Sequence, residues 1–412
     1  STGVENVLIG GLAGDALTTG IQNVAIGKDA LSTKTTGSAD IAIGHQALQD
    51  ADGGDAFNIA VGYRAGRNIT TGIRNILIGA SAGDSLLVGI DNIAIGYQSL
   101  ASEDDHGKNV AVGHQTLENL NAGADGNNVA VGYNSGYAMT TGRYNVLMGS
   151  EAGDALTTGA RNTAIGYAAL STEDAFGYNV AIGSGSLAAL NAGGDGYNVA
   201  VGNDTGAAMT TGIRNTIMGA HAGDALTTGS YNVAVGYQAL STEDGNGRNV
   251  ALGYNALATL NAGTEGYNTA VGMSAGEVMT TGVQNTLIGG LAGDALTIGS
   301  YNTAVGAYAL SAEDANGYNT AIGGYALNAQ NAGANVYNVA IGWQAGAVVT
   351  TGTENTIIGS FAGDALTTGS YNVAIGVEAL TTEDGNGKNI AIGRQALRVQ
   401  NAGADAYNVA VG

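Results

Sequence analysis

The chain contains no cysteine and no proline, and only 11% of its 412 residues are charged. Without cysteine, neither disulfide bonds nor thiol chemistry can contribute to its stability or function. The charged fraction is less than half of the roughly 25% that is usual in soluble domains. Apolar runs also fall short of the ~18 residues of a membrane-spanning helix. This composition argues against two or three ordinary globular domains, although the length alone would allow them.

Basic residues are scarce as well. The sequence has 13 Lys and Arg against 34 Asp and Glu, so its formal net charge is −21 at pH 7. Nucleic acids and anionic membranes are bound largely through cationic side chains. We therefore expect neither nucleic acid binding nor membrane insertion.

Glycine and one short motif are what the sequence has in abundance. There are 70 glycines, and a motif of Asn, a β-branched residue, usually Ala, usually Ile or Val, and then Gly recurs in 24 copies. The fifth residue is Gly in every copy, and the first is Asn in all but one, where Asp40 replaces it. The motif begins at positions 6, 23, 40, 58, 75, 92, 109, 128, 145, 162, 179, 198, 215, 232, 249, 268, 285, 302, 319, 338, 355, 372, 389 and 408.

The spacing of the copies defines a longer cycle. We call the stretch from one motif to the next a coil, and from residue 58 onward coils of 17, 17, 17 and 19 residues form a super-repeat of 70 residues. The first cycle is one residue shorter. Each of the four coils has its own loop sequence, represented by Met-Thr-Thr-Gly at 139–142, Ala-Gly-Asp-Ala-Leu at 152–156, Glu-Asp at 173–174 and Asn-Ala-Gly at 191–193.

The motif predicts a short β-strand. Its β-branched residues alternate with Ala, which places the two kinds of side chain on opposite faces of an extended segment. A coil of 17–19 residues is too short for a strand–helix–strand unit of about 30 residues, but it suits one turn of a parallel β-coil. We therefore predict an all-β parallel β-solenoid of 24 coils, in one continuous domain over residues 1–412 without linkers.

Two motif positions are expected to be structural. Stacked Asn residues, such as Asn23 and Asn232, would form a ladder in which side-chain amides hydrogen-bond along the axis. The Gly that ends each strand, such as Gly27 or Gly236, would occupy a turn that a side chain strains. A catalytic or ligand-binding role for so many identical Asn copies is not expected.

The central strand residue raises the question of oligomeric state. It is Ala in 18 copies, and the six exceptions all fall in the second coil of a cycle. This pattern predicts that the central residues lie in a confined space that admits one large side chain per cycle. A thin solenoid buries little apolar surface by itself, so we expect several chains to associate along this Ala face. The exceptions are Leu8, Leu77, Leu147, Ile217, Leu287 and Ile357.

The repeats resemble those of two groups of fibrous proteins. Residues 162–170 (Asn-Thr-Ala-Ile-Gly-Tyr-Ala-Ala-Leu), preceded by Thr-Thr-Gly at 157–159, resemble the repeat arrays of phage tail-fibre proteins. The motif is also similar to that of the β-roll heads of trimeric autotransporter adhesins, although the coils here are longer. The resemblance covers the whole chain and implies a homotrimeric, left-handed parallel β-roll in an extracellular fibre, of either a virion or a cell surface.

Side chains suited to catalysis are few. No Ser/His/Asp set recurs and no zinc-ligand spacing is present. We therefore expect no enzymatic activity. The sequence has four histidines, His45, His106, His114 and His221.

Acidic residues recur once per cycle in two loops, and Ca²⁺ prefers oxygen ligands of this kind. The glycine-rich calcium-binding repeat is absent, so we expect no bound metal and interpret these loops as solvated segments that discourage aggregation. Ca²⁺ is the alternative, with Asp154, Asp224 and Asp294 as candidate ligands. The recurring residues are Asp15, Asp84, Asp154, Asp224, Asp294 and Asp364, and the pairs Glu103/Asp104, Glu173/Asp174, Glu243/Asp244, Glu313/Asp314 and Glu383/Asp384.

Tyrosine precedes the ladder Asn in consecutive coils, at Tyr301, Tyr318 and Tyr337. Residues one coil apart would stack into an aromatic row. We interpret the row as ring stacking that stabilises the coil edge, with contact to sugar rings as the alternative.

The near-uniform repeats favour a structural role, because a binding site would break their symmetry. We expect a shaft segment of an extracellular trimeric fibre, a phage tail fibre or a cell-surface adhesin, that positions a receptor-binding tip for host attachment. The alternatives are a rod that itself binds a glycan or protein, and a subunit of an end-to-end filament. Terminal coils of a solenoid expose strand edges, so we expect further fibre domains or stacked copies at both ends.

Overall fold

The computed structural model describes residues 2–313, 315, 317–401 and 403–412, and the regular elements in these ranges are all β-strands. The chain forms two compact units, Ser1–Asp204 and Thr205–Gly412. We call them the first and second unit. Among the described residues there is no helix that is long and apolar enough to cross a membrane.

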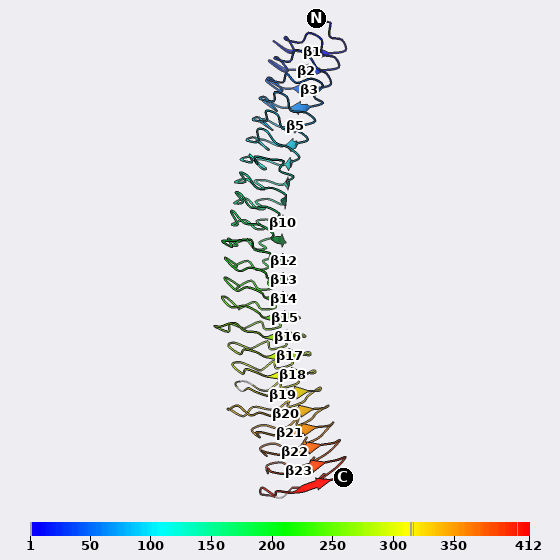
Figure 1. The fold of residues 1–412 in the computed structure, drawn as a ribbon, viewed down its shortest axis with the longest axis vertical. Coiled ribbons are helices and arrows are strands. Elements are labelled where there is room, and N and C mark those ends of the chain that lie inside the picture. Colours follow the sequence, from blue (N-terminus) through cyan, green and yellow to red (C-terminus); the bar gives the residue numbers. More distant parts are fainter. Residues whose placement is uncertain (1, 314, 316, 402) are drawn as a thin grey trace. The chain divides into compact units, whose positions relative to one another are not determined.

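In the first unit, each strand from β1 to β11 pairs in parallel with the strand of the next coil, so equivalent motif residues lie side by side (Figure 1). The register is kept across the 19-residue coil, where Val110 pairs with Val129, because the additional residues lie in the loop. The strands of this unit are β1 (Val7–Ile9), β2 (Val24–Ile26), β3 (Ile41–Ile43), β4 (Ile59–Val61), β5 (Ile76–Ile78), β6 (Ile93–Ile95), β7 (Val110–Val112), β8 (Val129–Val131), β9 (Val146–Met148), β10 (Thr163–Ile165), β11 (Val180–Ile182) and β12 (Val199–Val201).

The second unit has the same organisation, with parallel in-register pairs such as Val250 and Thr269. The predicted all-β parallel solenoid is thereby confirmed in both units. The strands of the second unit are β13 (Thr216–Met218), β14 (Val233–Val235), β15 (Val250–Leu252), β16 (Thr269–Val271), β17 (Thr286–Ile288), β18 (Thr303–Val305), β19 (Thr320–Ile322), β20 (Val339–Ile341), β21 (Thr356–Ile358), β22 (Val373–Ile375), β23 (Ile390–Ile392) and β24 (Val409–Val411).

The central residue of each strand points into the coil. Ala25 and Ala181 in the first unit, and Ala234 in the second, are completely buried, while the β-branched residues beside them are partly exposed. The expectation that chains associate along the Ala face is therefore wrong. Ala lines the interior because the return segment of the same coil packs directly against it, and the β-branched residues form the outer face.

The large residues at the central position fill space that glycines leave free. Leu147 is completely buried. A Cβ atom on Gly136 would lie 2.8 Å from Leu147 Cδ1, and one on Gly153 would lie 2.9 Å from Leu147 Cδ2. In the following coil the sizes are exchanged, because the central strand residue is Ala164 and Leu170 replaces the glycine. The core is thus packed by alternating large and small residues rather than by a uniform column.

The turn after each strand requires glycine. Gly27 and Gly236 have φ angles of +133° and +136°, which L-residues rarely adopt. A Cβ atom on Gly236 would also lie only 2.3 Å from the carbonyl oxygen of Gly253 in the next coil. The backbone conformation and the close contact between coils both disfavour a side chain at these positions.

The Asn ladder is present, and its strongest links involve the backbone. The N–H of Asn23 donates to Asn6 Oδ1 at 2.9 Å, and that of Asn232 donates to Asn215 Oδ1 at 2.8 Å. Asn23 Nδ2 donates to the carbonyl of Gly37 at 3.1 Å and also to Asn6 Oδ1 at 3.2 Å. Links between side-chain amides were predicted and do occur, but the side-chain oxygen mainly accepts from the next backbone.

Candidate functional site

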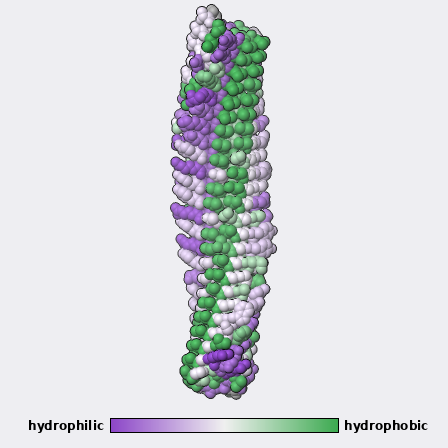
Figure 2. Space-filling model, turned by 90° about the vertical axis from the view of Figure 1, so that its right-hand side faces the viewer, coloured by the Kyte–Doolittle hydropathy of each residue, from purple (hydrophilic) through white to green (hydrophobic). Residues whose placement is uncertain are grey.

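The outer side of the strands is the most extended apolar feature of each unit. We call the second and fourth motif residues of all coils the strand face, and they are all Val, Ile, Thr, Leu or Met. Ile78 and Met148 are 38% and 42% exposed in the first unit, and Met218 and Ile288 are similarly exposed in the second. Figure 2 shows apolar side chains gathered into a band on one face. Contiguous apolar surface of this kind marks interaction sites in soluble proteins.

The predicted tyrosine row is formed. The rings of Tyr301 and Tyr318 are stacked with centroids 4.9 Å apart, and those of Tyr318 and Tyr337 are 5.1 Å apart. All three side chains are exposed, but neighbouring rings cover each other's faces. A sugar ring stacks on an aromatic face, so the space between these rings is not available to it.

A second aromatic row was missed by the sequence analysis. Tyr308 and Tyr325 stack at 5.0 Å, and Trp343 meets Tyr325 edge-on at 5.4 Å. The signal was present, because both tyrosines stand two positions after the motif Gly in consecutive coils. Three histidines also lie beside exposed tyrosines, with His45 on Tyr63 as the example.

Several cationic side chains lie against tyrosine rings in the row that precedes the ladder. The guanidinium of Arg161 lies 5.4 Å from the ring centre of Tyr144 and 5.3 Å from that of Tyr178. Arg161 also donates to the Tyr178 hydroxyl at 2.8 Å. These cations therefore stabilise the coil edge and do not form a patch for an anionic ligand.

The glutamate of each Glu-Asp loop is buried. Glu173 Oε1 accepts from the N–H of Phe176 at 3.2 Å, and Oε2 accepts from that of Ala192 at 3.3 Å. Burial raises the pKa of Glu173 and raises that of Glu103 to about 7. The interpretation of these loops as solvated is therefore wrong for the glutamates, and Asp314 lies outside the described residues. The buried set is Glu103, Glu173, Glu243, Glu313 and Glu383.

The aspartates of the Ala-Gly-Asp loops are half-buried from the second cycle onward, whereas Asp15 is exposed. Burial raises the pKa of Asp154 and of Asp294. Asp224 Oδ2 lies 3.7 Å from His221 Nδ1. Among the residues that the structure describes, none of the three Ca²⁺ candidates joins two further metal-ligating side chains. One group of three does meet that criterion, and it consists of Glu103, Asp104 and His106.

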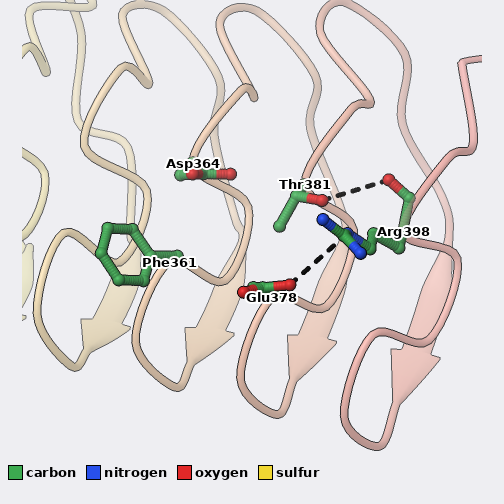
Figure 3. A pocket seen from close by; sticks show the side chains of 5 residues that line it. All are labelled: Phe361, Asp364, Glu378, Thr381 and Arg398. Atoms are coloured by element: carbon green, nitrogen blue, oxygen red, sulfur yellow. Dashed lines mark hydrogen bonds and ion pairs between the residues drawn. The ribbon is translucent and has the colours of Figure 1, made fainter.

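A hollow in the second unit is lined by Phe361, Asp364, Glu378, Thr381 and Arg398 (Figure 3). Arg398 Nε lies 3.4 Å from Glu378 Oε2, and Thr381 Oγ1 donates to the Arg398 carbonyl at 3.1 Å. Burial raises the pKa of Asp364. The cation of the hollow, Arg398, is paired with Glu378, whereas Asp364 Oδ1 has no hydrogen-bond partner among the described residues.

These features leave the strand face as the best candidate for a functional surface. The aromatic rows, the cations and the hollow are engaged largely in contacts within the chain, whereas the strand face of each unit is apolar and open. Comparison with known proteins adds no assignment, because neither a protein-family model nor a curated protein matches the sequence.

Proposed function

We propose that the chain is a structural segment of an extracellular homotrimeric fibre, in which the strand faces of three parallel copies pack against one another. The observation that carries this proposal is the apolar strand face, which repeats in every coil and carries no charged residue. Burial of apolar surface is the main driving force of protein association. Association also gives a thin solenoid additional buried apolar surface, of which a single chain has little.

Parallel alignment follows from the repeat. Copies that run in the same direction bring identical residues together at each level, so a contact that fits in one coil fits in the others. The larger side chains Met148 and Met218 on this face stand one cycle apart and favour a single register. The net charge of −21 limits further lateral growth, because like-charged assemblies repel one another.

In this proposal the chain is a left-handed β-roll shaft without enzymatic activity or cofactor. It positions a receptor-binding tip of a phage tail fibre or cell-surface adhesin for host attachment, and further fibre domains or stacked copies extend it. The rival proposal, direct glycan binding by the rod, is supported by the exposed tyrosine rows. The mutual stacking of those rings favours the shaft.

Analytical ultracentrifugation of the full chain tests the proposal. We expect a mass of three times 40.6 kDa. Replacing Ile78 and Met148 together by Asp should dissociate the trimer, because it places charge in the centre of the apolar contact. The matched change Thr172→Asp, at an exposed loop position, should leave the mass unchanged. A stable folded wild-type monomer would reject the proposal, and tight glycan binding that Tyr318→Ala abolishes would favour its rival.

A further inference from the structure

The loop between Glu103 and Asn109 differs chemically from its counterparts in other cycles. Glu103 is completely buried, and its Oε2 accepts from the N–H of Ala122 at 3.4 Å. Its Oε1 has no hydrogen-bond partner in good geometry among the described residues, although the backbone N–H of His106 interacts with the carboxylate and partly offsets the effect of burial on its pKa. The nearest imidazole atom, His106 Nδ1, lies 3.8 Å away and likewise lacks a hydrogen bond in the described part of the chain.

The equivalent loops satisfy the same glutamate oxygen with a donor. Asn246 Nδ2 donates to Glu243 Oε1 at 3.1 Å, and Asn386 Nδ2 donates to Glu383 Oε1 at 2.9 Å. His106 stands at the position of these asparagines. The histidine thus replaces an amide donor by a nitrogen that can bind a metal ion.

Asp104 supplies a third group. Its Oδ1 accepts from the N–H of Asp105 at 2.7 Å. One ligand atom from each of Glu103, Asp104 and His106 lies within 4.8 Å of the others. The neighbouring cation Lys108 forms an ion pair with Asp125.

The loop is both held in place and accessible. The carbonyl of His106 accepts from ladder Asn92 Nδ2 at 3.2 Å, which fixes the backbone at this point. The His106 side chain is 28% exposed, so an ion can reach it from solvent. Glu103 presents its unpaired oxygen from the interior, and the two loop residues approach from the solvent side.

We propose that Glu103, Asp104 and His106 bind one divalent transition-metal ion, with Zn²⁺ as the reference ion and water completing its coordination. Zn²⁺ binds imidazole nitrogen and carboxylate oxygen at about 2.0–2.2 Å in four-coordinate sites. Ca²⁺ prefers six to eight oxygen ligands, and a site with one imidazole suits it poorly. The ion would neutralise the buried carboxylate and connect the loop to the ladder. This proposal does not depend on the trimer proposal.

Isothermal titration calorimetry of the full chain with ZnCl₂ at pH 7.5 tests the site. We expect one Zn²⁺ per chain. His106→Asn, which installs the residue found at Asn246 and Asn386, should bind at least about tenfold more weakly, because loss of even an outer-shell partner costs 10–100-fold in affinity. His106→Phe, which installs the residue found at Phe176, serves as a second variant.

The matched control is His221→Ser, which removes a histidine beside Asp224 and installs the residue of the equivalent Ser81. It should keep the tight site, and circular dichroism confirms the fold of each variant. Equal Zn²⁺ affinity in wild type and both His106 variants would overturn the proposal. So would the absence of saturable Zn²⁺ binding, or one-per-chain binding of CaCl₂ as tight as that of ZnCl₂.

Discussion

The coils that begin at Asp40 and Asn179 are equivalent in the cycle, yet the loops before them bury opposite charges. Lys34 Nζ is completely buried, pairs with Asp40 Oδ2 at 2.7 Å and donates to the carbonyls of Gly53 and Gly54 at 3.0 and 3.1 Å. Glu173 occupies the position of Lys34 and is held by two backbone N–H groups. The same backbone therefore accepts either sign of charge when its partners change with it.

The residue at the ladder position explains why Lys34 and Asp40 occur together. Asn179 Nδ2 has no hydrogen-bond partner in the described part of the chain, so an Asp at this level gives up no donor contact. Asp40 Oδ1 still accepts from the N–H of Asn58 at 2.8 Å, as a ladder oxygen should. Its second oxygen is buried, which raises the pKa of Asp40, and the ion pair with Lys34 opposes that rise. The comparison teaches that the ladder tolerates a charge only as a pair.

Breaking that pair should have the largest effect. Lys34→Met leaves Asp40 buried without a counter-charge and should lower the local free energy of unfolding by about 3–5 kcal/mol. Lys34→Met combined with Asp40→Asn removes both charges and should recover most of the loss. Hydrogen exchange of the Asn58 amide measures both effects. A double variant as unstable as the single one would show that the charges are not coupled.

The glycine that ends the strand is the same in the coils that begin at Asp40 and Asn179. Gly44 and Gly183 share the positive φ of Gly236. Gly236→Val should cost about 1–3 kcal/mol for the backbone conformation alone, and contact with Gly253 adds to this. Thermal unfolding followed by circular dichroism provides the measurement. The matched control is Gly290→Val, because a Cβ there would meet no described atom within 4 Å. Equal melting temperatures for the two variants would contradict the assigned role.

The smallest effect concerns pH. Burial raises the pKa of Glu173, so the folded state binds its proton more tightly than the unfolded state does. The free energy of unfolding should therefore fall as pH rises from the unfolded pKa of 4.5 through the raised folded pKa. Glu173→Gln should make the free energy of unfolding depend less steeply on pH, because it removes one titrating carboxyl group. Urea unfolding at pH 5 and pH 8 checks this expectation, and an unchanged pH dependence would show that Glu173 does not contribute to it.

The repeat made the ladder and the turn predictable, because Asn232 and Gly236 recur at positions that stacking brings together. It could not tell which strand face is internal. Alternation distinguishes Ala234 from Val233 and Val235, but the choice depends on how the return segment, with Leu240, packs against the strand. The buried glutamates were mistaken for solvated residues because a charge in a loop usually is exposed. The sequence did contain a sign of burial, because Lys34 replaces the loop glutamate in the same cycle in which Asp40 replaces the ladder Asn.

The central claim is that strand faces of three parallel copies meet. Because the chain has no cysteine, a single introduced thiol is a unique label. Separate Ile78→Cys and Met148→Cys chains, treated with a short tris-maleimide, should give linked species of two and three chains at both sites. Thr172→Cys, exposed in a loop, should remain largely unlinked. Efficient linking through Thr172 but not through the strand-face positions, or pairs of chains without any three-chain species, would contradict the account.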